Sequence, residues 1–556
     1  MVFLPVLPIP AQVRPEDGTG LSLRSGSMVA CSHDCLTGVV RGFCQEIARR
    51  TGVVLETRAG RPGAPPDGVP SILAALGTDA DLGSLPDAAG ICPAGDAVDE
   101  RYSLTITGEG IVVRAPAPVG VFRGLTSLVQ LIATSPSRGD AAVALPGVRV
   151  IDAPRFAWRG CTLDVARTFF SVAEVGRVID LLALYKFNAL HLQLTADESW
   201  RLFAGRRAGR DLASGDPFYT RDDLMEIAGY AAARFITLIP GVNMPGHVTA
   251  MLRMYPELKT GRNTVGADLP PGMAHPFSWL DPEIPATFEL VETIVAEVAA
   301  ATPGPYLHIG GDEAFGMPDD LYGRFVRHLR RVVRSLGKKT VGWQETVRPG
   351  AGPGDVLQYW IDAPQKAGEL MGAPGELPPE IQAAINQANA KAAGDLVKAM
   401  AASARILVSP AGYAYLDVPY AESSVDRNQE ELRLRVGMPS YPRKTIEESF
   451  DWDPAAALGP DARPEHLAGV SGAAWTETIT DFDELAFMVL PRLPGIAQKA
   501  WSQHAGTTWA DYRKLLAEHP RLWAQDALTY FRSATVDWVR DPGGTTADDP
   551  RDTAAG

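Results

Sequence analysis

Two adjacent acids follow a pair of glycines in the segment HIGGDEAF, residues 308–315. The segment continues an apolar run typical of a buried strand. Neighbouring residues of a strand point to opposite faces, but beyond its end, where Gly310 and Gly311 free the backbone, Asp312 and Glu313 can enter one pocket. Glycoside hydrolysis needs a carboxylic acid that protonates the leaving oxygen and a second group that attacks or activates water. Glu313 is a candidate for the acid if the substrate is a sugar, which other residues must indicate.

Acids, tryptophans and other polar residues recur at the ends of other apolar runs: Arg159, Asp197, Glu198, His247, Trp343, Glu345, Trp360, Trp475 and Glu477. Aromatic faces pack on the C–H faces of pyranose rings, and carboxylates accept charge-assisted hydrogen bonds from hydroxyl groups. This combination predicts a sugar ligand. Spacing alone leaves the second catalytic group open among Glu345, Asp417 and Glu477.

Eight short apolar runs carry these residues, most with a helix-like segment between them: residues 161–166, 189–195, 235–242, 306–313, 339–345, 355–360, 404–410 and 467–477. Strand and helix alternating eight times predicts an α/β fold with a (β/α)8 TIM barrel. One predicted connecting helix begins at Ser171, which forms a capping box with Glu174. In such barrels the chemistry lies at the carboxyl ends of the strands.

The chain is predicted to have three parts. Residues 1–150 alternate short strand-like runs with an apolar helix-like segment at 120–134, which is typical of a small α+β domain. Residues 151–505 form the barrel, with insertions around 365–400 and 418–466. Residues 506–556 are a helical extension followed by a polar, Gly- and Pro-rich flexible tail.

Composition narrows the function classes. The 556 residues carry a net charge of -14, which argues against nucleic acid or an anionic membrane as a partner. The amino terminus lacks the charged start of a secretory signal, and the five cysteines form an odd, sparse set that fits a reducing compartment. We therefore expect a cytoplasmic protein, or a secreted one if a leader was removed, with no cofactor and no metal.

The segment RGCTLDVARTFFSVAEVGRVIDLLALYKFNALHLQLTADESWRL is followed in order by MPGH, HIGGDEAF, GWQE, QYW, AYLD and WTE. This series resembles the β-N-acetylhexosaminidases of glycoside hydrolase family 20 over about residues 155–500, and the amino-terminal part resembles the small domain that precedes the barrel in that family. The resemblance implies a retaining exo-enzyme that removes terminal, non-reducing β-linked N-acetylglucosamine or N-acetylgalactosamine. The acetamido oxygen of the substrate attacks the anomeric carbon, so no enzyme nucleophile is required.

The resemblance also implies a role for each site residue. Glu313 is the general acid and then the base, Asp312 orients the acetamido group, and Tyr415 donates a hydrogen bond to its oxygen. The tryptophans wall the pocket that holds the acetamido methyl, and the remaining residues bind the sugar. The predicted substrate-binding residues are Arg159, His247, Trp343, Trp360, Asp417, Trp475 and Glu477.

Five positions depart from the family pattern. Gln193 and Ala196 replace a His and an Asp, Gly241 and Asn243 replace acids, and Thr168 replaces a common His. Each change removes a supporting charge or hydrogen bond near the catalytic pair. A second hypothesis is therefore a non-catalytic or weakly active amino-sugar-binding homologue.

A third hypothesis is a metal-dependent barrel hydrolase that uses His191, His247 and His308 with nearby acids. These histidines lie on separate predicted strands, and Gln193 interrupts the only His-x-His spacing. The sequence leaves open the gluco or galacto preference, the leaving group and the oligomeric state.

Overall fold

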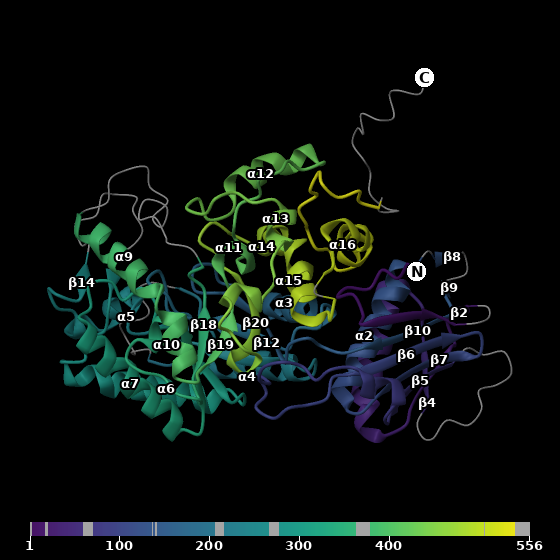
Figure 1. The fold of residues 1–556 in the computed structure, drawn as a ribbon, viewed down its shortest axis with the longest axis horizontal. Coiled ribbons are helices and arrows are strands. Elements are labelled where there is room, and N and C mark those ends of the chain that lie inside the picture. Colours follow the sequence, from purple (N-terminus) through teal and green to yellow (C-terminus); the bar gives the residue numbers. More distant parts are fainter. Residues whose placement is uncertain are drawn as a thin grey trace.

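The computed structural model describes residues 3–16, 20–58, 71–135, 137–138, 142–205, 216–265, 277–362, 379–504 and 506–539. In Figure 1 the amino-terminal domain, in purple and blue, lies beside a larger barrel in teal and green, and the yellow carboxyl-terminal helices lie over the junction between them. Within the described part of the chain, no helix is long and apolar enough to cross a membrane.

The larger body is a closed barrel of parallel strands, one overlapping each of the eight predicted segments, and β11 begins three residues before its predicted start. The strands are β11 (Trp158–Asp164), β12 (Ala189–Gln193), β13 (Thr237–Gly241), β16 (Tyr306–His308), β17 (Lys339–Trp343), β18 (Val356–Tyr359), β19 (Arg405–Val408) and β20 (Leu467–Ala474). All residues of β11, β12 and β20 are buried, because helices or the barrel interior cover both faces. The predicted (β/α)8 barrel is confirmed.

Amphipathic helices cover the outside of the barrel: α3 (Val172–Leu184), α4 (Arg221–Ala232), α6 (Pro285–Ala301), α7 (Asp319–Ser335), α14 (Phe482–Val489) and α15 (Arg492–Trp501). The predicted capping box at the start of α3 is present, with reciprocal hydrogen bonds between Ser171 and Glu174. Val175, Ile179 and Leu182 then form its buried stripe.

Three long connections lie at the carboxyl ends of the strands. The first, after β13, contains α5 (Thr249–Met254), η3 (Pro256–Leu258), β14 (Thr264–Val265) and β15 (Phe277–Ser278). The second, after β18, contains α9 (Pro379–Ala392) and α10 (Asp395–Ala401), which confirms a helical insertion there, although residues 363–378 lie outside the described part. The third, after β19, contains α11 (Ala411–Ala414), η5 (Arg427–Gln429), α12 (Glu430–Arg435), α13 (Ile446–Phe450), η6 (Ala456–Leu458) and η7 (Pro464–His466).

The amino-terminal domain is built on a seven-stranded mixed sheet, in the spatial order β1, β10, β6, β7, β5, β3, β4. The bounds in chain order are β1 (Gln12–Pro15), β3 (Met28–Cys31), β4 (Glu56–Arg58), β5 (Ser71–Leu76), β6 (Tyr102–Thr107), β7 (Gly110–Ala115) and β10 (Val148–Asp152). A small second sheet contains β2 (Leu21–Leu23), β8 (Ser137–Arg138) and β9 (Ala142–Leu145). The helices are η1 (Asp34–Leu36), α1 (Thr37–Thr51), η2 (Ala80–Ser84) and α2 (Pro118–Thr134), and α2 confirms the predicted apolar helix.

The carboxyl-terminal helices join the two bodies. Helices α16 (Trp509–Leu516) and α17 (Pro520–Gln525) follow the barrel, and α17 packs on α2. Just after α17, Asp526 accepts a 2.7 Å hydrogen bond from Arg50 of α1. The predicted boundaries at residues 150 and 505 stay predictions, and the predicted flexible tail lies outside the described residues.

Candidate active site

A cavity of about 160 Å³ opens at the carboxyl ends of the barrel strands. Nine of the ten predicted site residues line it: His247, Asp312, Glu313, Trp343, Trp360, Tyr415, Asp417, Trp475 and Glu477. These residues lie at or just beyond the carboxyl ends of six different strands. The barrel therefore brings together side chains that lie far apart in the sequence.

The backbone after β16 turns both acids into this cavity. Gly310 and Gly311 have φ angles of +70° and +95°, and Glu313 has a φ of +49°. A Cβ atom on Gly310 would lie 1.8 Å from Oδ1 of Asn243, so glycine is the residue that fits there. The strand ends at His308, and the next residues leave the extended conformation. The expectation that two glycines let neighbouring acids share one pocket is confirmed.

The two acids are arranged around an imidazole and an amide. Nε2 of His247 lies 3.4 Å from Oδ2 of Asp312 and 3.5 Å from Oε2 of Glu313. Asn243 donates a 2.8 Å hydrogen bond from Nδ2 to Oδ1 of Asp312, and its own Oδ1 accepts the backbone N–H of Gly311 at 3.2 Å. Asn243 thus fixes the Asp312 carboxylate against the turn that carries it.

His247 is held as a cation between carboxylates. Its Nδ1 lies 2.9 Å from Oδ2 of Asp197, whose other oxygen, Oδ1, accepts hydrogen bonds from Thr249. Burial alone would lower the pKa of His247, but the charge of Asp312 and hydrogen bonds to Asp197, Asp312 and Glu313 raise this pKa well above its usual value. A charged His247 donates from both ring nitrogens, so it fixes the acid pair relative to Asp197.

Three tryptophans form an aromatic wall. The ring centroid of Trp343 lies 5.7 Å from that of Trp475 and 6.4 Å from that of Trp360. The Nε1 atoms of Trp343 and Trp475 are buried, and neither has a protein hydrogen-bond partner among the described residues. The wall therefore offers flat apolar faces, as a bound pyranose and its acetamido methyl require.

A phenol and two carboxyl groups complete the cavity. The ring of Tyr415 packs 5.8 Å from that of Trp475, and burial raises the pKa of the Tyr415 hydroxyl well above its usual value, so it stays a donor. Burial and the negative charge of Glu477 also raise the pKa of Asp417. Oδ1 of Asp417 has no protein partner among the described residues, which leaves it available to a ligand hydroxyl.

Arg159 corrects one sequence prediction, because it does not reach the cavity. It lies near the amino end of β11, opposite the acid pair. Its guanidinium group donates to Oε2 of Glu100 at 2.6 Å and to the backbone carbonyls of Lys186 and Phe156 at 2.9 and 2.8 Å. Arg159 therefore joins the barrel to the amino-terminal domain. The prediction that it binds the sugar is wrong.

Arg167 is the arginine that lines the cavity. Its guanidinium group lies 3.0 Å from Glu198, 3.2 Å from Asp164 and 3.5 Å from Glu477. Sequence reasoning missed it, although it follows the carboxyl end of β11, where barrel chemistry is expected. Phe315, Met438, Ser440 and Tyr441 also line the cavity and were not selected from the sequence.

The departures from the family pattern have structural counterparts. A Cβ atom at Gly241 would lie 2.3 Å from Nε2 of His191, so the imidazole occupies the space of a larger residue. Gln193 lines the cavity and donates from Nε2 to the backbone carbonyl of Thr195 at 2.9 Å. Asn243 keeps a hydrogen bond to Asp312 without adding a charge. The acid pair is thus supported despite these changes.

Glu345 has a different position from the other candidates. It is buried and accepts a 3.2 Å hydrogen bond from Nε1 of Trp360, but it lines a neighbouring cavity. Burial is the main reason that its pKa rises to about 8, because the favourable charge of Arg348 only partly offsets burial. Its carboxyl group is therefore protonated at neutral pH.

The histidines considered for a metal site do not form one. The rings of His191 and His308 stack with their centroids 4.0 Å apart, and burial lowers the pKa of each. Across the described ranges, no group of three or more His, Cys, Asp or Glu side chains could hold a metal ion. The geometry does not favour the metal-dependent hydrolase.

A closed parallel barrel with a carboxylate pair in a tryptophan-lined cavity defines the class of a barrel enzyme that acts on carbohydrate. Comparison with known families agrees. Residues 156–504 match the catalytic domain of glycosyl hydrolase family 20, and residues 4–153 match domain 2 of the same family. The chain belongs to glycosyl hydrolase family 20.

Similarity to individual relatives extends over nearly the whole chain. A β-N-acetylhexosaminidase of Cellulomonas fimi is 33% identical over 543 residues, which cover 96% of this chain and 97% of the relative. The structure of a family 20 β-N-acetylhexosaminidase from Streptomyces coelicolor A3(2) superposes with a TM-score of 0.76 at 31% identity, covering 96% and 99% of the two chains. A mutant β-hexosaminidase of Streptomyces plicatus in complex with its product GlcNAc gives a TM-score of 0.75 at 30% identity, covering 96% and 98%.

Proposed function

We propose that this protein is a retaining exo-β-N-acetylhexosaminidase that releases terminal, non-reducing β-linked N-acetylglucosamine or N-acetylgalactosamine. The observation that carries the proposal is the acid pair: Asp312 and Glu313 both enter a tryptophan-lined cavity, and His247 and Asn243 fix Asp312 in place. The relatives from Cellulomonas fimi and Streptomyces coelicolor, which are β-N-acetylhexosaminidases, support the proposal.

In the first step, the acetamido oxygen of the substrate attacks the anomeric carbon, and the bond to the leaving oxygen breaks as Glu313 donates its proton to that oxygen. Asp312 accepts a hydrogen bond from the acetamido N–H and stabilises the positive charge of the oxazolinium ion. Tyr415 donates to the acetamido oxygen and keeps it aimed at the anomeric carbon. The enzyme therefore needs no nucleophile of its own.

In the second step, the Glu313 carboxylate takes a proton from water, which attacks the anomeric carbon and reopens the oxazolinium ring. Two displacements at one carbon retain the configuration. Arg167, Asp417 and Glu477 bind the sugar hydroxyls, so Arg167 takes the place first given to Arg159. Binding groups at several hydroxyls hold a single terminal sugar in the cavity.

The experiment compares hydrolysis of 4-nitrophenyl β-N-acetylglucosaminide with that of the plain β-glucoside. We expect cleavage of the acetamido sugar alone, and a loss of roughly 100- to 10,000-fold in kcat for Glu313→Gln, the usual contribution of general acid–base catalysis. Absence of cleavage with saturable binding of a thiazoline analogue would support the alternative, an amino-sugar-binding homologue. Equal cleavage of the plain glucoside would contradict assistance by the substrate.

A further inference from the structure

Trp360 differs from the other two tryptophans of the sugar cavity in how its indole is held. The Nε1 atoms of Trp343 and Trp475 have no protein partner among the described residues, whereas Nε1 of Trp360 donates a 3.2 Å hydrogen bond to Oε2 of Glu345. Glu345 is 5% exposed and Trp360 is 6% exposed, so water competes little for this bond. A buried polar contact therefore fixes one ring of the aromatic wall.

The backbone of Trp360 is held from the same place. Trp360 follows the last residue of β18, and its backbone N–H donates to Oε1 of Gln344 at 3.1 Å. The same oxygen accepts the N–H of Ile361 at 2.9 Å. Gln344 and Glu345 are the first two residues of η4 (Gln344–Val347), which directly follows β17. Two adjacent residues of one short helix thus hold both the backbone and the ring of Trp360.

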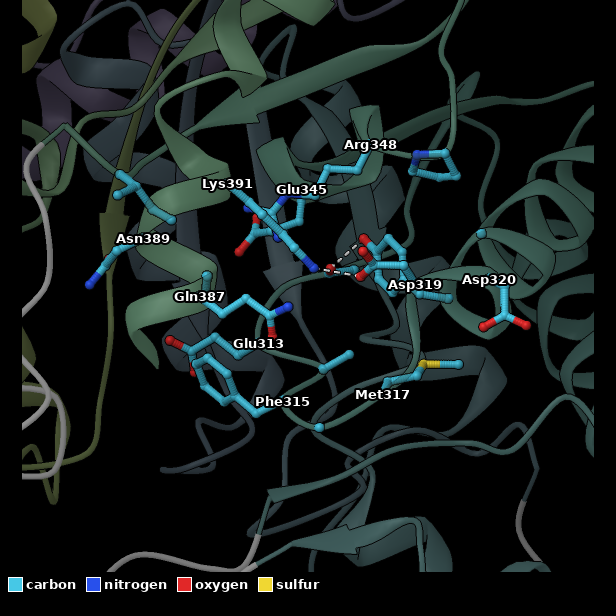
Figure 2. Close-up of a pocket in the computed structure, with 18 of the residues that line it drawn as sticks. Glu313, Phe315, Met317, Asp319, Asp320, Glu345, Arg348, Gln387, Asn389 and Lys391 are labelled. Atoms are coloured by element: carbon cyan, nitrogen blue, oxygen red, sulfur yellow. Dashed lines mark hydrogen bonds and ion pairs between the residues drawn. The ribbon is translucent and has the colours of Figure 1, made fainter. Parts of the chain in front are cut away.

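Further contacts keep η4 in place. Arg348, the residue after η4, forms a 2.8 Å ion pair with the buried Asp395 of α10. Within η4, Thr346 donates a 2.8 Å hydrogen bond to the backbone carbonyl of Trp343. In Figure 2, Glu345 and Arg348 lie near each other in the upper part of the neighbouring cavity of about 430 Å³. The support of Trp360 is therefore fixed both to β17 and to the helical insertion after β18.

The acyl group of the substrate packs against this supported wall in the proposed reaction. Asp312 accepts from the acetamido N–H and Tyr415 donates to the acetamido oxygen, so both polar atoms of the amide are engaged. The methyl group is the apolar part that remains. Tyr415 belongs to one buried apolar cluster with Trp343 and Trp360, and this cluster is the surface that the methyl group contacts.

We propose that Gln344 and Glu345 are positioning residues that hold Trp360 and so limit the acyl group of the substrate to acetyl. This inference rests on the proposed function. The extra methylene of a propionyl group has to displace part of a close-packed wall. A shift of Trp360 breaks its hydrogen bond to Glu345, and a buried indole N–H without an acceptor is costly. The bond therefore adds to the discrimination between acetyl and propionyl.

The protonation state of Glu345 provides a matched pair of variants. Burial raises the pKa of Glu345 to about 8, so below that pH its side chain is a neutral carboxyl group. Gln has nearly the same shape and keeps an oxygen that accepts from Trp360, whereas the thioether of Met is only a weak acceptor. Glu345→Met is therefore the test variant, and Glu345→Gln is the conservative variant that retains the acceptor.

A second control separates this effect from a general loss of stability. Thr340 lies on β17, the strand that leads to η4, and donates a buried 2.8 Å hydrogen bond to Asp355. Thr340 lines neither the sugar cavity nor the neighbouring cavity. Thr340→Val therefore removes a buried hydrogen bond from the same strand without touching the support of Trp360.

The experiment measures kcat/KM for two 4-nitrophenyl β-glucosaminides, one N-acetylated and one N-propionylated, at a pH below the pKa of Glu345. Wild type should prefer the acetyl substrate by roughly 10- to 200-fold, the usual discrimination for one methylene group. Glu345→Met should reduce this preference by about fivefold or more, the change that corresponds to one lost hydrogen bond. Glu345→Gln and Thr340→Val should keep the wild-type preference.

A Glu345→Met protein that folds, as thermal unfolding shows, and keeps the wild-type preference would overturn this inference alone. An equal loss of preference in Glu345→Gln or Thr340→Val would also overturn it, because neither variant removes the acceptor. If Glu345→Met does not fold, Gln344→Met carries the same expectation, since it removes the acceptor for the backbone N–H of Trp360. A wild type that cleaves neither substrate would overturn the proposed function and this inference with it.

Discussion

Asn243 offers a sharp test of how this chain supports its acid pair. Its amide donates to Asp312 at 2.8 Å and accepts the N–H of Gly311 at 3.2 Å, and the residue is only 3% exposed. Asn243→Ala removes both hydrogen bonds, the one to Asp312 and the one from the turn after β16. The Asp312 carboxylate would then be fixed mainly by His247, 3.4 Å away.

The size of the effect follows from the charge on Asp312. A hydrogen bond to an ionised group contributes about 1.5–3 kcal/mol, compared with about 1 kcal/mol between neutral groups. If that energy is realised in the transition state, kcat/KM falls roughly 10- to 150-fold, at 1.36 kcal/mol for each factor of ten. Because Asp312 acts on the developing oxazolinium ion, we expect kcat and kcat/KM to fall together.

The assay is steady-state hydrolysis of 4-nitrophenyl β-N-acetylglucosaminide by wild type, Asn243→Ala and Gln193→Met. Gln193 is the matched control, since it lines the same cavity but its amide donates to the backbone of Thr195 and not to the acids. We expect a smaller loss for the control. A kcat/KM for Asn243→Ala equal to that of wild type would refute the idea that this amide positions Asp312.

Two further predictions concern the two arginines, one structural and one in the sugar cavity, and the buried carboxyl group of Glu345. Arg159→Met should lower the free energy of unfolding by about 3 kcal/mol, because it leaves Glu100 partly unpaired, with little change in KM. Arg167→Met should raise KM, because it removes a cation that lines the sugar cavity, and thermal unfolding and kinetics together would show this difference between the two variants. Glu345 has a pKa of about 8 in the folded protein, above its ordinary value near 4.5, so the folded state binds more protons and the wild type loses stability as pH rises between these values. Glu345→Gln removes this loss of stability. The melting temperature of the variant minus that of wild type should therefore increase from pH 5 to pH 8. If this difference in melting temperature stays constant with pH, Glu345 is not buried and protonated as the structure indicates.

The barrel could be predicted because its strands are buried on both sides and therefore appear as continuous apolar runs. The acid pair could be predicted because the two glycines before Asp312 indicated a turn at a strand end. Arg159 was given a sugar-binding role by the family resemblance although it precedes the predicted strand at residues 161–166. Because β11 begins at Trp158, Arg159 lies at the amino end of the strand, opposite the chemistry. Arg159 and Arg167 lie near opposite ends of the same strand, β11, and only Arg167 lies at the carboxyl end.

The neighbouring cavity, which Glu345 lines, could not be predicted from the sequence, for a different reason. Glu313, Glu345 and Gln387 come from three separate connections, and their meeting depends on how α9 folds back over the barrel. The spacing of residues along the sequence does not predict how these helices pack. The same holds for the contact of Asn243 with Asp312, which joins residues 69 positions apart.

The most direct test of the central claim is the response of kcat/KM to the acetamido group itself. Successive fluorine substitution of the acetamido methyl in 4-nitrophenyl β-N-acetylglucosaminide weakens the carbonyl oxygen as a nucleophile and leaves the leaving group unchanged. If the substrate supplies the nucleophile beside Asp312 and Glu313, kcat/KM falls steeply with each fluorine added. A value that stays constant across the series would contradict substrate assistance and point to an enzyme carboxylate as the nucleophile.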